Sequence, residues 1–569
     1  MRNIEIAWSL KELSDLLEFK GEDYFKIRAY RRAAKTLVGL PSSAAEMYRN
    51  GTLKDVPGVG KNILAKIGEL IETGECDLLR RLREEIPPGI VQVMAVPGMG
   101  PKRTRVFYEQ LEITSIKELE KAARSRRIRS LPGMGAKREQ EILRNIKMLN
   151  DNLGSFILST ALEIATEFVQ YLSELPDVDN VAVAGSVRRW RETVQDVDIL
   201  VSTLSPQDLL STLNRHPLVN NVSFQDERRA NFITTWGIPG EILTVPSSCY
   251  IPALVWCTGN NGHWTKLKDI ALSKGYKLEA EGVFEHNGTQ VPVASEEDFY
   301  HKLGLEYIPP EMREDRGEIE QAQSGNLPQV LREAKMRGDL HIHSNWSDGG
   351  NSIEELVNKA KEKGYSYLAI TDHSQSLKIA RGLPVERLLE QWEYIDGLNR
   401  ELKGFQVLKG IEVDILSNGE LDYPDQILSR ADVVVASVHS GFKQEREKIT
   451  GRIVAAIENP HVDIIGHLTG RLIGHRSGYD VDVEKVIKKA AENNTALEIN
   501  SSPDRLDLDE FNARLAAEYG VMLAINTDAH DLRRMDEMIY GIAVSRRAWL
   551  GADNILNTKE LPELLSYLR

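Results

Sequence analysis

The sequence is poor in cysteine and has no long apolar run. Its 569 residues include three cysteines, Cys76, Cys249 and Cys257, and no two of them form a CxxC pair. This usage excludes a cysteine-based zinc site and is typical of a reducing compartment, so we expect a cytoplasmic protein. No segment approaches the ~20 apolar residues of a membrane span, and the start lacks the order of a signal peptide. We therefore expect no membrane partner.

Charge is distributed unevenly along the chain. The formal net charge is −14, which alone argues against a nucleic-acid partner. Residues 1–150, however, carry a balance of +8 and the remaining residues a balance of −22. This asymmetry predicts phosphate contacts in the N-terminal 150 residues. It also predicts metal sites in the rest of the chain, where the acidic groups cluster.

A short glycine-containing pattern occurs three times in the basic front. The copies are "VPGVGKNILAKI" from Val56, "VPGMGPKRTRVF" from Val96 and "LPGMGAKREQEI" from Leu131. Each Gly-x-Gly permits a tight turn, and the helix that follows offers free N–H groups to a phosphate. Three copies predict helix-hairpin-helix motifs that bind DNA without sequence specificity. The predicted DNA-contacting glycines are Gly58, Gly60, Gly98, Gly100, Gly133 and Gly135.

Lys66 follows the first of these turns, on the second helix of the hairpin. A lysine partly desolvated among other cations could lose its proton and attack an aldehyde as a Schiff-base nucleophile. An exposed lysine that contacts phosphate explains the position as well.

The stretch "AGSVRRWRETVQDVDIL" (184–200) combines a Gly-Ser turn, arginines and two aspartates. On a strand, Asp196 and Asp198 leave the same face and can share divalent metal ions. The turn and an arginine can grip a triphosphate, so this stretch predicts a nucleotidyl-transfer site.

The last 230 residues alternate apolar, strand-like runs with amphipathic segments. In "SIEELVNKAKEKG", Ser352 and Glu355 are expected to form a capping box at a helix start. Seven runs read as strands, and polar residues stand at their carboxyl ends, which is the plan of a β/α barrel. The sixth run, "TALEINSSP", has no assigned ligand. The predicted ligands are His341, His343, Asp348, His373, Glu412, His439, His467, Asp528 and His530.

This ligand set exceeds what one ion takes. Six imidazoles, two aspartates and a glutamate imply two or three ions, and the mixed donors favour Zn²⁺ or Mn²⁺. Arg471, in "GHLTGR", is expected either to contact phosphate or to form a structural salt bridge.

Residues 1 to about 315 resemble a family X DNA polymerase in "AYRRAA", "VPGVGKNILAKI", "AGSVRRWRETVQDVDIL" and "LGLEYIPPEMRED". The resemblance implies Mg²⁺ or Mn²⁺ on Asp196 and Asp198, and a 5′-deoxyribose-phosphate lyase site at Lys66 with Tyr30. The implied contacts to the incoming dNTP are Gly185, Ser186, Arg189, Trp256, Thr258 and Gly259.

The chain departs from the family pattern at three positions. The family's third catalytic aspartate corresponds to Glu241, whose longer side chain displaces the carboxylate. Cys257 replaces one of two aromatic residues, and Asn260 replaces a serine. These departures leave DNA binding intact and place the efficiency of polymerisation in question.

The region from 338 to 569 is similar over its whole length to the polymerase-and-histidinol-phosphatase (PHP) domain, and all nine ligand positions are filled. The resemblance implies metal-dependent phosphoester hydrolysis. Next to a family X polymerase it implies 3′→5′ exonuclease and abasic-site endonuclease activity.

The expected fold class is multidomain, α and α/β. We predict a lyase-like helical domain (1–80), fingers with two helix-hairpin-helix motifs (81–150), a nucleotidyltransferase palm (151–262) and a thumb (263–315). A linker (316–337) and a distorted (β/α)₇ PHP barrel (338–569) complete the chain.

The leading hypothesis is a monomeric DNA-repair enzyme that acts on gapped or nicked DNA, adding a nucleotide in the palm and cleaving phosphodiesters in the barrel. One alternative is a nuclease with weak or lost polymerase activity. Another is a small-molecule phosphatase of the histidinol-phosphatase type, against which the basic hairpins argue.

Overall fold

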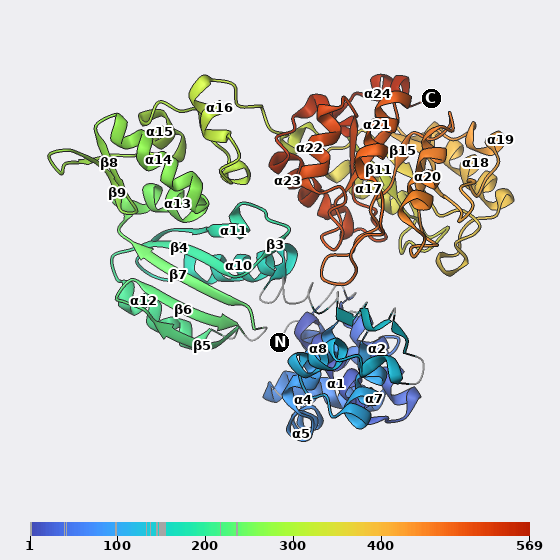
Figure 1. The fold of residues 1–569 in the computed structure, drawn as a ribbon, viewed down its shortest axis with the longest axis horizontal. Helices are drawn as coiled ribbons and strands as arrows, with labels where there is room; N and C mark the ends of the chain where they lie inside the picture. Colours follow the sequence, from blue (N-terminus) through green and yellow to red (C-terminus); the bar gives the residue numbers. More distant parts are fainter. Residues whose placement is uncertain are drawn as a thin grey trace. The chain divides into compact units, whose positions relative to one another are not determined.

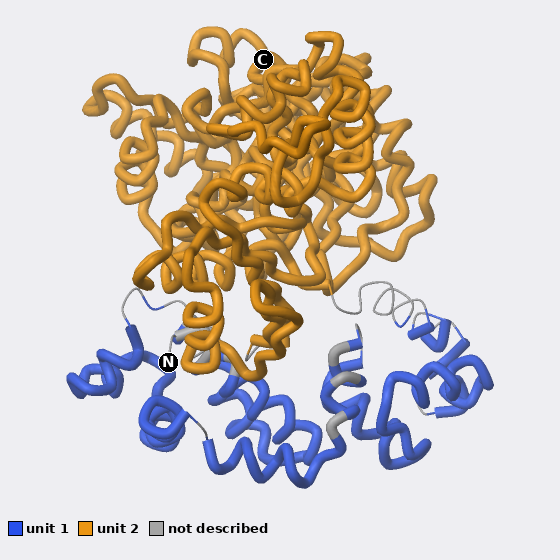
Figure 2. Tube along the Cα trace, turned by 90° about the vertical axis from the view of Figure 1, so that its left-hand side faces the viewer, with its two compact units in different colours: residues 1–153 blue, residues 154–569 orange. Residues whose placement is uncertain are grey.

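The computed structural model describes residues 3–38, 40, 43–74, 76–96, 99–131, 134–136, 138–140, 142–143, 146, 155–216, 218–234 and 237–568. The chain forms two compact units, residues 1–153 and 154–569 (Figure 2). None of the described helices is both long and apolar enough to cross a membrane.

The first unit is helical in its described part. Apolar residues of α1 at helical spacing, such as Leu10, Leu13 and Leu17, are buried in its core. In the first hairpin, Gly58 has φ +95° and Gly60 caps the start of α4, as a tight turn before a helix requires. The helices are α1 (Asn3–Lys20), α2 (Tyr24–Val38), α3 (Ala44–Arg49), α4 (Lys61–Thr73), α5 (Asp77–Glu85), α6 (Pro88–Ala95), α7 (Gly100–Leu111) and α8 (Ile116–Arg124).

The second unit begins with a mixed sheet in the region predicted as the palm, called here the palm region (residues 155–262). Its strand order is β2-β4-β7-β6-β5, with β4 and β7 parallel and the other neighbours antiparallel (Figure 1). The elements are β1 (Phe156–Ile157), α10 (Leu158–Ser173), β2 (Val178–Val183), α11 (Gly185–Arg188), β3 (Thr193–Val194), β4 (Val197–Thr203), α12 (Pro206–Thr212), β5 (Val219–Phe224), β6 (Arg229–Thr234), β7 (Pro239–Val245) and α13 (Tyr250–Thr258).

Alternation along β4 gives this sheet two apolar faces. Ile199 packs with Phe168 of α10, whereas Leu200 packs with Leu254 of α13. Asp198 therefore lies on the face covered by α13.

The thumb region (residues 263–315) and the connector (316–337) follow. Leu331 of the connector is buried in the core of the barrel, so the connector packs against the barrel. The elements are α14 (Asn261–Ser273), β8 (Tyr276–Glu279), β9 (Gly282–Glu285), β10 (Gln290–Val291), α15 (Glu296–Lys302), η5 (Pro310–Met312), α16 (Glu318–Ser324) and η6 (Glu333–Lys335).

The barrel (residues 338–568) is built from parallel strands in sequential order, β11 to β17. A parallel bridge between Ile342 and Ala529 links the first and last strands, which closes the sheet and confirms the predicted seven-stranded barrel. Its strands are β11 (Gly338–Ile342), β12 (Tyr367–Ile370), β13 (Gln406–Asp414), β14 (Val433–Ser437), β15 (Ile464–Ile465), β16 (Ala496–Asn500) and β17 (Leu523–Asn526).

Helices surround these strands. The predicted capping box is confirmed, because the Ser352 side chain accepts from the N–H of Glu355 and the Glu355 side chain from that of Ser352. The helices are α17 (Ile353–Glu362), α18 (Val385–Glu401), α19 (Asp425–Leu428), α20 (Arg446–Ile457), α21 (Val483–Asn493), α22 (Glu510–Glu518), α23 (Met538–Arg547) and α24 (Leu561–Tyr567).

Candidate catalytic sites

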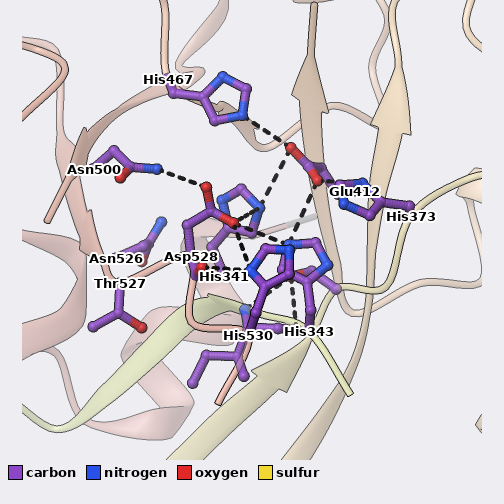
Figure 3. Close-up of polar contacts among 12 residues, drawn as sticks. His341, His343, His373, Glu412, His467, Asn500, Asn526, Thr527, Asp528 and His530 are labelled. Atoms are coloured by element: carbon purple, nitrogen blue, oxygen red, sulfur yellow. Dashed lines mark hydrogen bonds and ion pairs between the residues drawn. The ribbon is translucent and has the colours of Figure 1, made fainter. Parts of the chain in front are cut away.

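The predicted barrel ligands meet at the carboxyl ends of the parallel strands. Figure 3 shows the rings of His341, His343 and His530 gathered near Asp528, with Glu412 opposite. Six of the nine predicted ligands are buried, and Asp348, His439 and His530 are partly exposed. The parallel topology explains the convergence, since these strand ends share one edge of the sheet.

Glu412 is the centre of the cluster. Its carboxylate oxygens lie 2.7 to 3.6 Å from ring nitrogens of five histidines. The side chain of Glu412 is 1% exposed. The five histidines are His341, His343, His373, His439 and His467.

Three groups within this cluster have the geometry of metal sites. In each group the potential ligand atoms lie within 4.8 Å of one another. The groups overlap, because His343 belongs to two of them and His373 to two. They are His343 with Asp348, His373 and His530; His341 with His343 and Asp528; and His373 with Glu412 and His439.

Several nitrogen and oxygen atoms of the cluster are placed to bind cations but do not form hydrogen bonds with one another. Within the described part of the chain, buried Nε2 of His341, both ring nitrogens of His343 and Oε2 of Glu412 have no hydrogen-bond partner. Nδ1 of His373 lies 2.7 Å from Oε2 of Glu412 but is not aligned for a hydrogen bond. Buried donor atoms left unpaired are costly, and ligation of divalent ions would satisfy them.

The protonation states of His343 and Glu412 suit ligation. Burial, together with the neighbouring His530 and His373, lowers the pKa of His343 to about 3, so its ring is neutral at physiological pH. Although burial opposes it, the facing histidines hold the pKa of Glu412 well below its ordinary value. A neutral imidazole and an ionised carboxylate are the forms that bind metal.

Two carboxylates that the sequence analysis did not assign support these ligands. Oε1 of Glu498, on β16, lies 2.7 Å from Nδ1 of His341, and its Oε2 accepts from the N–H of His467 at 2.9 Å. Oδ1 of Asp414 lies 2.5 Å from Nδ1 of His439. Carboxylates on the second nitrogen of a ligating histidine fix its ring orientation and tautomer. The sequence signal that could have identified Glu498 was its place as an acidic residue inside the largely apolar run "TALEIN".

In the palm region, Asp198 and Glu241 are neighbours in the parallel pairing of β4 with β7. Paired residues in neighbouring strands point to the same face, so both carboxylates lie together. Gly185, with φ +59°, lies so close that a Cβ there would be 1.9 Å from Oδ2 of Asp198. Only glycine permits this approach.

These carboxylates repel one another. Burial, Asp196 and Glu241 raise the pKa of Asp198 to about 7. Asp196 and Glu241 thus both act on the charge of Asp198, and Arg189 opposes them. Among the described residues, however, the three do not form a group whose oxygens all lie within 4.8 Å.

The predicted phosphate contacts differ in their surroundings. The hydroxyl of Ser186 is buried without a hydrogen-bond partner among the described residues. Arg189, by contrast, donates from Nε to Glu314 (3.0 Å) and from Nη1 to the carbonyl of Thr258 (2.7 Å). The Ser186 hydroxyl is thus unpaired but buried, whereas Arg189 would have to exchange its partners to bind a phosphate.

Trp256 and Gly259 lie on either side of Thr258 at the end of α13. Trp256 faces a cavity of about 330 Å³, with the guanidinium of Arg229 5.4 Å above its ring. Gly259 ends α13, and a Cβ there would be 2.8 Å from the ring of His263.

The predicted lyase residues lie in the first unit. Lys66 forms an ion pair with Glu69 at 2.5 Å, and this hydrogen bond raises the pKa of Lys66, opposed by partial burial. The direction is opposite to the one that activates a lysine nucleophile. Tyr30 is 6% exposed and close enough to interact electrostatically with Lys66. Gly98 and Gly133 lie outside the described residues, and Gly135 is exposed.

Arg471 forms the salt bridge that was one of its two predicted roles. Its Nη2 lies 2.7 Å from Oε2 of Glu192, and its Nε donates to the carbonyl of Arg505 at 2.8 Å.

Family models match four parts of the chain. Residues 1–76 match a helix-hairpin-helix domain and residues 91–148 a SAM-like helix-hairpin-helix tandem. Residues 253–314 match the DNA polymerase beta thumb and residues 339–502 the PHP domain. DNA-binding hairpins, a polymerase thumb and a PHP barrel in one chain define the class of polymerases that carry a PHP domain.

Relatives identify the family within this class. The chain is 37% identical over 572 residues to the "DNA polymerase/3'-5' exonuclease PolX" of Bacillus subtilis (strain 168). The match covers 100% of both chains. The chain belongs to the PolX family. The chain also resembles probable phosphatases over a smaller part of its length. The one of Thermoanaerobacter sp. (strain X514) is 34% identical over 41% of this chain and 94% of the relative, and the one of Shewanella halifaxensis is 30% identical over 40% and 91%.

Proposed function

We propose that this chain is a DNA-repair enzyme, a gap-filling DNA polymerase in the palm region and a metal-dependent 3′→5′ exonuclease and abasic-site endonuclease in the barrel. The observation that carries the proposal is the presence of two separate groups of ligands in one chain. The full-length PolX relative bears a name for both activities.

In the barrel, the nine predicted ligands would hold two or three Zn²⁺ or Mn²⁺ ions, and in the palm region Asp196, Asp198 and Glu241 would hold Mg²⁺ or Mn²⁺. Bound there, such ions activate water and stabilise charge on phosphate oxygens. The unpaired nitrogens of His341 and His343 support the barrel assignment.

The chain's own groups orient these ligands and the substrates. Glu498 and Asp414 hold the rings of His341 and His439. Ser186 and the backbone of the Gly185 turn would bind the triphosphate of a dNTP, and Trp256 would contact the nucleotide. The hairpin glycines would bind gapped or nicked DNA, and Lys66 with Tyr30 would form a 5′-deoxyribose-phosphate lyase site. We further propose that the enzyme is a monomer. We also propose that it is cytoplasmic, which agrees with its three free cysteines.

One alternative is favoured by a specific observation. Glu241 stands where the family pattern has aspartate, and the three palm carboxylates are not gathered as the barrel ligands are. A nuclease with weak or lost polymerase activity would show both features. A phosphatase acting on small molecules agrees with the probable phosphatases among the relatives. These relatives, however, match only 41% and 40% of a chain that also contains helix-hairpin-helix and polymerase thumb matches.

The test uses the purified full chain on DNA with a one-nucleotide gap, with Mg²⁺ or Mn²⁺, with and without dNTPs. We expect incorporation by the natural chain and none by Asp196→Ala. Cleavage without dNTPs should occur in both. Absence of incorporation by the natural chain, with cleavage retained, would establish the alternative. Hydrolysis of histidinol phosphate without any action on DNA would contradict both DNA activities.

A further inference from the structure

The turn formed by residues 189–192, called here the 189–192 turn, joins the two predicted functional segments of the palm region. It follows Gly185 and Ser186 directly, and it precedes Asp196 and Asp198 by a few residues. Its second residue, Trp190, has φ +54°, a left-handed conformation that is unfavourable for a bulky side chain. Such a conformation persists where the surrounding structure holds it.

A buried arginine of the barrel holds this turn. Arg547 ends α23 and its side chain is 2% exposed. Its Nη1 donates to the carbonyl of Arg189 at 2.7 Å and to Oε1 of Glu314 at 3.0 Å. Because Glu314 also accepts from Nε of Arg189, one barrel side chain fixes both the backbone and the guanidinium of Arg189.

Two further barrel side chains contact the next residues of the turn. Tyr540 lies two helical turns before Arg547, on the same face of α23. Its ring meets that of Trp190 edge-on, with centroids 5.7 Å apart. Arg471, from another barrel segment, pairs with Glu192 at 2.7 Å.

We propose that the barrel positions the nucleotide-binding turn of the palm region, with Arg547 as the main positioning residue. Three side chains from two barrel segments hold Arg189, Trp190 and Glu192, so the turn keeps its strained conformation only while the barrel contacts it. The consequence for activity rests on the proposed polymerase function. Because the turn sets the place of Ser186 and Arg189, loss of the barrel contact should weaken dNTP binding more than it slows the chemical step.

The test compares Arg547→Lys with Arg546→Lys in the full chain. Lysine keeps the charge of Arg547 but loses the fork, whose Nη1 donates to the turn while Nη2 donates to Glu510 of the barrel. Arg546 is the adjacent arginine of α23, and it contacts Glu311 and the carbonyl of Leu331 instead of the turn. Hydrogen exchange of the amides of residues 186–191 is measured first, and steady-state gap filling second.

We expect Arg547→Lys to accelerate exchange in this segment about tenfold and to raise KM for dNTP about tenfold, the effect of losing one hydrogen bond to a charged group. We expect kcat to change less than about threefold, because no reacting group is removed. Arg546→Lys should leave both the exchange and KM at the natural values. Exchange and KM unchanged in a folded Arg547→Lys chain would overturn the proposal.

A second variant decides if Arg547→Lys does not fold. Glu192→Gln removes the ion pair with Arg471 from a side chain that is 36% exposed, so the fold should tolerate it. We expect faster exchange of residues 186–191 in this variant, and unchanged exchange would overturn the proposal. If the natural chain incorporates no nucleotide, the proposed polymerase function fails, whereas the exchange measurement still tests the positioning.

Discussion

The barrel gathers nine predicted ligands at one strand edge, six of them buried, whereas the palm region offers three half-buried carboxylates. In the barrel, imidazoles face Glu412 and carboxylates behind them orient the rings. In the palm region, Asp196 and Glu241 repel Asp198, and the nearby Arg189 offsets this repulsion only in part. From this difference we expect the barrel to bind metal ions by itself, whereas a metal site in the palm region would need further oxygens from nucleotide and DNA.

Removal of a barrel ligand should have the largest effect. We expect His341→Ala to lower nuclease activity at least about 1000-fold, since ligation contributes several kcal/mol to transition-state stabilisation. Primer extension should change less than about twofold, because distant independent sites behave additively. Both are measured on one gapped substrate. The exposed His475 serves as the control through His475→Ala, and loss of both activities together in His341→Ala would contradict separate centres.

Removal of the central palm carboxylate is the converse experiment. We expect Asp198→Ala to lower nucleotide incorporation by at least about 100-fold, because the ligand shared by the proposed palm ions is lost. Nuclease activity should stay at the natural level. Asp179→Ala, on the neighbouring strand β2, is the matched control. A fall in nuclease activity equal to the fall in incorporation would show that the centres are not independent.

The support behind the barrel ligands predicts a smaller effect. Glu498→Gln keeps the size of the side chain but removes the carboxylate that orients His341. We expect the affinity for Mn²⁺ to fall about 10- to 100-fold, as is typical for loss of such a partner. Competition with a chelator measures it, with Glu484→Gln on the exposed face of α21 as the control. Unchanged affinity would show that the barrel does not depend on this support.

Glu241→Asp should act in the opposite direction. The shorter side chain moves the carboxylate by about 1 Å, and displacement of that order can change a rate considerably. We expect single-turnover incorporation to rise about tenfold, while Glu174→Asp, exposed at the end of α10, has no effect. A slower Glu241→Asp chain would mean that glutamate is already correctly placed by its pairing with Asp198.

The sequence predicted the barrel more completely than the palm, for physical reasons. Parallel strands place all their carboxyl ends on one edge, so ligand types at successive strand ends had to meet, as His341 and Asp528 do. The capping box at Ser352 followed from local spacing alone. The support from Glu498 could not be assigned, because the pairing of its strand with β15 and β17 sets which ligand it reaches.

Side-chain partners explain the remaining differences. The family resemblance implied that Arg189 contacts phosphate, yet its guanidinium is held by Glu314, 125 residues away in sequence. The chemistry of Lys66 depends on Glu69, one helical turn away, which raises the pKa of the lysine. No local pattern specifies Glu314 as a partner of Arg189, whereas Glu69, three residues after Lys66 on the same helix, could have been identified from the spacing.

Metal content without substrate tests the central claim most directly. The chain is loaded with Mn²⁺, passed through a desalting column in the absence of DNA and nucleotide, and the bound metal per chain is measured. A barrel that is complete by itself predicts two or three retained ions in the natural chain and in Asp198→Ala, with fewer in His341→Ala. Loss of retained metal in Asp198→Ala, with His341→Ala unchanged, would contradict it.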